Sequence, residues 1–150
     1  MTSMARHAVP PDTLTATLEA IVEAQIAECR AILRATQQVE EAVGRLDFGA
    51  VDRAMADRAR AMERIGELEA EAAELRGRAF EPPPDLEKRL AELRSLVRAV
   101  ERADRKARET AQKALHGIRQ QLRELARGHQ GLQGYRPHGP PLPRFTDRRG

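Results

Sequence analysis

Apolar residues recur at steps of three and four along most of the chain, in three separate stretches. A segment with two glycines divides the first stretch from the second, and three consecutive prolines divide the second from the third. Because this spacing places apolar side chains on one face of an α-helix, it predicts three helices. We expect them at residues 12–46, 50–78 and 85–127.

The predicted helix boundaries coincide with residues that favour turns and caps. Glycines at both ends of Gly44–Gly49 are typical of a tight connection between neighbouring helices. The run Pro82–Pro84 cannot continue a helix and separates the second helix from the third. Capping oxygens are available at Asp12 and Thr13 for the first helix and at Asp85 for the third.

The apolar stripes of the second and third helices alternate between three- and four-residue steps, which is typical of coiled-coil-like packing. In the third helix only Asp104 places a carboxylate where the pattern calls for an apolar group. In the second helix, the predicted stripe consists of Val51, Met55, Ala59, Met62, Ile65, Leu68 or Glu69, Ala72 and Leu75.

These patterns predict an all-α fold, an elongated antiparallel three-helix bundle or helical hairpin over residues 12–127. Residues 1–11 are expected to be disordered, and residues 128–150, rich in Pro and Gly, to form a flexible tail. Composition supports the fold class, because 25 of the 150 residues are Ala, only four are aromatic and none is Trp. Such a composition excludes an all-β fold.

Charge is distributed unevenly along the chain. Residues 11–81 contain 9 Arg against 15 Asp and Glu, whereas residues 82–150 contain 16 Lys and Arg against 8 Asp and Glu. An acidic first half can pack beside a basic second half, and an excess of Arg is also compatible with nucleic-acid binding. Acidic residues within the third helix are spaced so that they can pair with its basic residues, which favours a solvent-exposed face. No nucleic acid is therefore expected as a partner.

Residue types that carry enzymatic chemistry are sparse and scattered. The four His residues share no metal-ligand spacing with one another or with Cys29, and the two Ser residues lie outside any nucleophile motif. The chain is therefore predicted not to be an enzyme and to use no cofactor or metal. A lone Cys, no signal-peptide pattern and no long apolar run predict a cytoplasmic protein without membrane insertion.

Two surfaces are candidates for binding a partner. The end of the third helix carries an apolar row that either packs against the first helix or docks a partner helix. The tail carries Tyr135 and Phe145 among prolines, and these aromatics either fold back onto the helices or anchor a partner. The apolar row consists of Leu115, Ile118, Leu122 and Leu125.

Three segments resemble the FlgN-like family of flagellar export chaperones, which serve the hook–filament junction proteins. Gly44–Val51 looks like the family's short connection between helices. Val100–Asp104 resembles part of its long last helix, with an Asp where the family usually has an Asn-type residue. Leu122–Gly128, followed by Tyr135 and Arg144–Arg149, is similar to the family's closing pattern.

The resemblance implies a cytoplasmic chaperone that binds the C-terminal helical segment of a hook-associated (hook–filament junction) protein and prevents premature assembly. It also implies delivery of this cargo to the flagellar type III export gate. Cargo would lie against the apolar row, and the cytoplasmic domain of the gate would contact Tyr135 and Arg136. Two alternatives stay open: a chaperone of the filament cap protein, and a self-associating coiled-coil protein with a structural or regulatory role.

Overall fold

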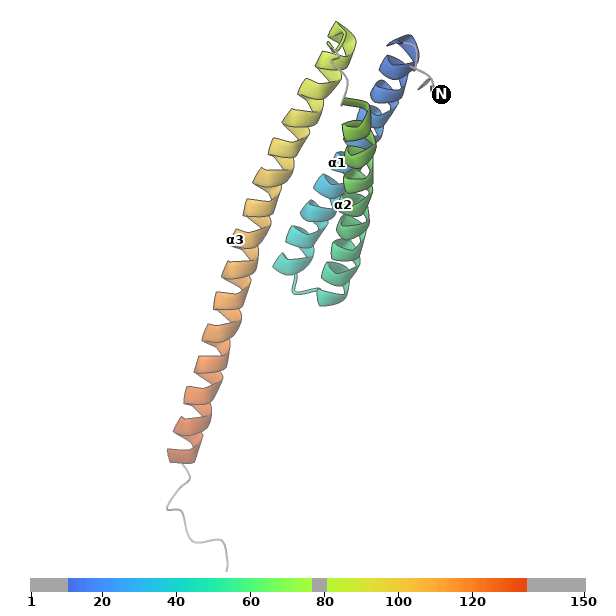
Figure 1. The fold of residues 1–150 in the computed structure, drawn as a ribbon. Coiled ribbons are helices and arrows are strands. Elements are labelled where there is room, and N and C mark those ends of the chain that lie inside the picture. The colour runs from blue at the N-terminus through green and yellow to red at the C-terminus, as the bar shows by residue number, and fades with distance from the viewer. Residues whose placement is uncertain (1–10, 77–80, 135–150) are drawn as a thin grey trace, which may run out of the picture. The chain divides into compact units, whose positions relative to one another are not determined.

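Residues 11–76 and 81–134 are described by the computed structural model, and they form three helices with no strand among them. Helix α1 spans Pro11–Gly44, α2 spans Phe48–Arg76 and α3 spans Pro84–Gly134 (Figure 1). The predicted all-α fold of three helices is confirmed.

Two compact units divide these helices along the sequence. Met1–Ala111 contains α1, α2 and the first part of α3, and Gln112–Gly150 contains the remainder of α3. The predicted helical region of residues 12–127 extends into both units, and its assignment to one bundle stays a prediction. Of the predicted disordered N-terminus, Pro11 is the first residue of α1, and residues 1–10 lie outside the described part of the chain.

Helix α1 holds the first unit together, because it packs against both α2 and α3. One core cluster joins α1 to the beginning of α3, and a second joins α1 to α2. The first consists of Leu14, Leu18, Val22, Ile26 and Leu86. The second consists of Ile21, Leu68 and Ala72. Leu75 of α2 packs against both clusters, and each fully buried Leu or Ile contributes about 1.5–3 kcal/mol through burial.

The buried face of α2 differs from the predicted stripe. Ala54 and Ala61 are buried, whereas Met55 and Met62 are 46% and 48% exposed. Small side chains let α2 approach α1 closely, and Ile21 of α1 packs against Leu68 and Ala72 of α2. The buried and half-buried stripe of α2 therefore consists of Val51, Ala54, Arg58, Ala61, Ile65, Leu68, Ala72 and Leu75.

Backbone hydrogen bonds define the connection between α1 and α2. The N–H of Leu46 donates to the C=O of Val43 at 3.0 Å, and the N–H of Asp47 donates to the C=O of Ala42 at 2.9 Å. These are the two bonds of a Schellman motif, and Leu46 has a positive φ of 57°. Asp47 then caps α2, because its Oδ1 accepts the N–H of Ala50 at 3.1 Å. The predicted tight connection is present, but a leucine holds the left-handed position that glycine favours.

Replacing Leu46 with Gly is expected to raise the free energy of unfolding by about 1 kcal/mol. A left-handed conformation costs a non-glycine residue roughly 1–2 kcal/mol, and the greater chain entropy of glycine offsets part of the gain. Little apolar burial is lost, because Leu46 is 47% exposed. Thermal unfolding followed by circular dichroism should give a higher midpoint for Leu46→Gly and no rise for Leu46→Ala. A lower midpoint for Leu46→Gly contradicts the assigned strain.

The caps predicted at Asp12, Thr13 and Asp85 are wrong, because all three residues lie inside their helices. The helices begin instead at Pro11 and Pro84. Proline is favoured at the first helical position because its fixed φ suits the helix and its missing N–H has no partner there. Asp85 lies in the first turn of α3, where its carboxylate interacts favourably with the positive end of the helix dipole.

Helix α3 continues past its predicted end at Arg127 to Gly134. Gly128 and Gly131, which were expected to break the helix, lie within it. Each glycine costs a helix only about 1 kcal/mol relative to alanine, and no proline occurs in this part of α3 to end it. Residues 128–134 of the predicted tail are therefore helical, and residues 135–150 lie outside the described part of the chain.

Candidate functional site

The four predicted cargo-binding residues lie on α3 in the second unit and share one helix face, because they are three and four residues apart. Leu115, Leu122 and Leu125 are 48%, 59% and 69% exposed, and Ile118 is half-buried. Leu132 continues the face with 72% exposure. Sequence reasoning missed Leu132 because the helix was predicted to end before it. These five residues are called the leucine row.

The rest of this helix surface is polar and mainly basic. Residues 112–134 carry four Lys and Arg residues against the single acidic residue Glu124. The basic residues are Lys113, Arg119, Arg123 and Arg127. An amphipathic helix with an exposed apolar row is a surface that binds a partner helix or another apolar surface.

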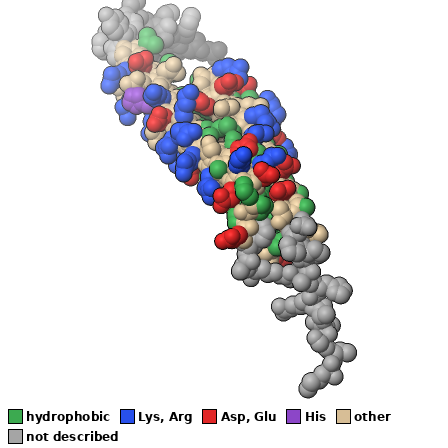
Figure 2. Space-filling view, turned by 90° about the horizontal axis from the view of Figure 1, so that it is seen from above, with side chains coloured by type: hydrophobic (Ala, Val, Ile, Leu, Met, Phe, Trp, Pro, Cys, Tyr) green, Lys and Arg blue, Asp and Glu red, His purple; other side chains and the backbone are tan. Residues whose placement is uncertain are grey.

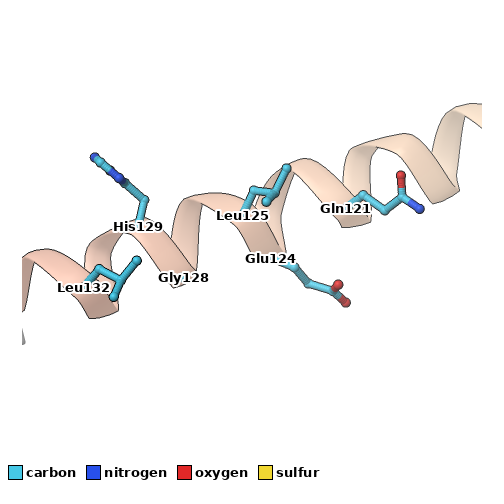
Figure 3. Close-up of a pocket in the computed structure, with 6 residues that line it drawn as sticks. All are labelled: Gln121, Glu124, Leu125, Gly128, His129 and Leu132. Carbon is cyan, nitrogen blue, oxygen red and sulfur yellow. The ribbon is translucent and has the colours of Figure 1, made fainter.

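A depression borders the leucine row at Gly128. Figure 3 shows Leu125 and Leu132 one turn away from Gly128 on either side along the helix. No atom lies within 4 Å of the position that a Cβ at Gly128 would take. The depression is lined by Gln121, Glu124, Leu125, Gly128, His129 and Leu132.

The predicted gate-binding residues, Tyr135 and Arg136, lie outside the described part of the chain. They follow directly after the last residue of α3, Gly134. Their role stays a prediction from the resemblance.

A polar cluster that sequence reasoning missed joins all three helices within the first unit. Arg58 of α2 donates from Nη2 to Oδ1 and Oδ2 of Asp104 on α3, at 3.0 and 2.9 Å. The Nε of Arg58 donates to Oγ1 of Thr36 on α1 at 3.3 Å. Thr36 in turn donates to the C=O of Ile32 at 2.8 Å. The carboxylate that interrupts the apolar stripe of α3 thus has a guanidinium partner in the stripe of α2.

The environment of this cluster indicates a structural role. The side chains of Arg58 and Asp104 are only 21% and 27% exposed, and Thr36 is buried. An adjoining cavity of about 270 Å³ is lined mainly by Thr36, Arg58, Asp104 and apolar side chains. Pairing of opposite charges at facing stripe positions specifies how helices align, because any shifted alignment leaves both charges unpaired. Complementary charges at stripe positions of two helices are the sequence signal that could have found this cluster.

Three further ion pairs link α1 to α3 at the surface of the first unit. Arg30–Glu92 and Arg89–Glu23 are both 2.7 Å apart, and Lys106–Glu40 is 3.6 Å apart. Acidic and basic residues occur on both helices, so the pairing does not follow a simple acidic-half and basic-half division. Figure 2 likewise shows side chains of both signs on the visible face. Each exposed pair is worth at most about 1 kcal/mol.

Helix α1 also buries two side chains that carry reactive or polar atoms, Cys29 and Gln25. Burial raises the pKa of the Cys29 thiol above its ordinary value, and the nearby carboxylates of Glu69 and Glu28 add to this effect. The thiol is therefore protonated at neutral pH and a poor nucleophile. Gln25 is 4% exposed, and its Oε1 has no hydrogen-bond partner among the described residues.

Neither a metal centre nor a membrane span is found in the described residues. No group of three or more His, Cys, Asp or Glu side chains there is arranged to hold a metal ion. None of the three helices combines the length and apolar character needed to cross a membrane, as far as the described residues extend.

Comparisons of the chain with protein families, with curated proteins and with solved structures found no match. What the protein binds must therefore be inferred from its own residues, above all from the leucine row.

Proposed function

We propose that this chain is a cytoplasmic export chaperone that binds the C-terminal helical segment of flagellar hook-associated proteins. Binding prevents premature assembly of the cargo, and the chaperone then brings it to the cytoplasmic domain of the flagellar type III export gate. The observation that carries the proposal is the exposed leucine row on α3. The cargo class and the gate come from the resemblance to FlgN-like chaperones.

The leucine row supports this function in two ways. Its three- and four-residue spacing matches the apolar face of an amphipathic helix, so a helical cargo segment can pack along it. Its small area and aliphatic composition also favour moderate affinity, because tight interfaces depend on large buried areas and aromatic anchors. A chaperone that releases its cargo at the export gate requires reversible binding of this kind.

Self-association is a second candidate function, because the same spacing suits a coiled coil between two copies of α3. Analytical ultracentrifugation at micromolar concentration separates the two functions. A stable dimer that Leu122→Gln dissociates supports self-association, and a monomer that binds hook-associated protein supports the chaperone.

The proposed function is tested by co-purification from a flagellated strain in which the tagged chain replaces its own chromosomal copy. Hook-associated proteins are expected to co-purify with the full chain. Tyr135→Ala is expected to keep this capture and abolish swimming, because the gate contact is assigned to the tail and the cargo contact to the leucine row.

His138→Ala is the matched control, since it removes a different ring-bearing side chain from the same segment, and it should leave swimming intact. Normal swimming and export with Tyr135→Ala would show that the gate assignment is wrong. Failure of the full chain to capture any hook-associated protein would overturn the chaperone proposal itself.

A further inference from the structure

The second compact unit carries the excess positive charge of the chain. Gln112–Gly150 contains 8 Lys and Arg against 2 Asp and Glu, a net charge of +6 with His neutral. Met1–Ala111 contains 18 Lys and Arg against 21 Asp and Glu, a net charge of −3. The net charge thus changes sign at the boundary between the two units, and an anionic surface attracts the second unit and repels the first.

In the described part of the second unit, basic residues lie beside and opposite the leucine row. Arg119 lies four residues after Leu115 and three before Leu122, so it borders the row. Arg123 and Arg127 follow at four-residue steps, towards the side of α3 that faces away from the leucines. All three arginines are exposed, and none of them forms an ion pair with another described residue. Their charges are therefore available to a partner.

This arrangement is typical of helices that lie on a membrane surface. The apolar face of such a helix enters the boundary between lipid headgroups and acyl chains, and its basic face remains at the headgroups and in water. The helix lies parallel to the bilayer and does not cross it. Arginine side chains beside the apolar face are long enough to reach the lipid phosphates, with which a guanidinium forms two parallel hydrogen bonds.

A phospholipid surface fits the second unit better than a nucleic acid does. Both offer phosphate groups to arginine, but a nucleic acid leaves the leucine row in water, whereas a lipid surface covers it. Leu125 and Leu132 gain most from being covered, because 69% and 72% of their surfaces are exposed (Figure 3). Helix α3 also contains no Phe, Tyr or Trp that could stack on a base.

We propose that the second unit binds an anionic phospholipid surface, with the leucine row buried at the headgroup boundary and Arg119 and Arg123 at the lipid phosphates. This binding goes beyond the proposed function, because it requires neither cargo nor the export gate. If the proposed function holds, an anionic membrane also releases the cargo, since a leucine row covered by lipid cannot hold a hook-associated protein.

Sedimentation of the full chain with lipid vesicles tests the proposal. The chain is expected to bind vesicles of equal parts phosphatidylcholine and phosphatidylserine at least about tenfold more tightly than vesicles of phosphatidylcholine alone. The double variant Arg119→Gln, Arg123→Gln should bind the phosphatidylserine vesicles about thirtyfold more weakly, because two charges near an anionic surface contribute about 2 kcal/mol.

Arg94→Gln, Arg98→Gln is the matched control for charge. It removes two exposed arginines of the same helix that likewise form no ion pair with a described residue, but these lie in the first unit. This variant should bind the phosphatidylserine vesicles as tightly as the unaltered chain does.

A second pair of variants tests the apolar contact. Leu122→Gln, Leu125→Gln should weaken binding to the phosphatidylserine vesicles by about a hundredfold, because two largely exposed leucines lose their burial in lipid. Met55→Gln, Met62→Gln removes two exposed apolar side chains from the first unit and should leave vesicle binding unchanged. Circular dichroism should show full helicity for every variant, since none of the replaced side chains is buried.

Three results would overturn the proposal: equal binding to the two kinds of vesicle, equal binding by the two arginine variants, or binding to duplex DNA with no binding to vesicles. Failure of the lipid site is distinguishable from failure of the proposed function, because binding of hook-associated protein is measured without vesicles. If that protein binds and vesicles do not, the lipid site is wrong and the chaperone stands.

If vesicles bind and hook-associated protein does not, the lipid site stands and the cargo assignment is wrong. If both bind, phosphatidylserine vesicles should release the cargo. A complex that holds vesicle and cargo together would contradict burial of the leucine row in lipid.

Discussion

Replacing Asp104 with Leu is expected to lower the free energy of unfolding by about 2 kcal/mol, although it restores an apolar residue to the stripe of α3. The loss arises because Arg58 is left with its charge half-buried and without the carboxylate that accepts two of its hydrogen bonds. Breaking a fully buried ion pair costs about 3–5 kcal/mol, and partial access of water to this pair reduces the cost.

Denaturant unfolding of the full chain, followed by far-ultraviolet circular dichroism, measures this effect. The double variant Arg58→Met, Asp104→Leu should regain most of the lost stability, because two apolar side chains then face each other in the seam. Glu92→Gln is the control: it removes one partner of the exposed Arg30–Glu92 pair and should change stability by less than about 1 kcal/mol. A loss for Glu92→Gln as large as that for Asp104→Leu would show that the polar cluster has no special role.

Replacing both Leu122 and Leu125 with Gln is expected to weaken binding of a hook-associated protein by about a hundredfold. Both side chains are largely exposed in the free protein, at 59% and 69%, so a partner that covers them gains most of their apolar burial. A loss of roughly 1.5 kcal/mol for each leucine corresponds to about a hundredfold change in the dissociation constant. Isothermal titration of the purified chain with purified hook-associated protein measures the change.

Gln120→Ala provides the control on α3, because Gln120 is exposed and lies off the leucine row. The Leu122→Gln, Leu125→Gln double variant should keep its helix content, since Gln and Leu have similar helix propensities and neither leucine is buried. Unchanged affinity of the Leu122→Gln, Leu125→Gln variant would exclude the leucine row as the cargo site.

The helices and their approximate bounds could be predicted from the sequence, because long periodic segments separated by glycine and proline admit few other structures. The packing face of α2 could not be predicted from the sequence. Alanine occurs on several faces of that helix, and the apolar methionines Met55 and Met62 suggested stripe positions that the structure leaves exposed. What decides the face is the fit of Ala54 and Ala61 against α1 and the pairing of Arg58 with Asp104, both of which depend on partners distant in sequence.

The candidate site was predicted in part for a similar reason. Spacing alone was enough to place Leu115, Leu122 and Leu125 on one face. The end of α3 was misplaced, because Gly128 and Gly131 were taken to end a helix that their small energetic cost does not interrupt. That error concealed Leu132, which extends the leucine row only if the helix continues.

The core clusters of the first unit are built from aliphatic side chains and alanine, with no aromatic ring among the buried residues described. The chain has no tryptophan, and its one tyrosine, Tyr135, follows the end of α3. Intrinsic fluorescence excited at the tyrosine band therefore originates from the single position that directly follows α3 in the sequence. The protein thus contains its own optical probe for contacts made at the end of α3, and a partner that lacks tryptophan and tyrosine could be titrated against it without any label.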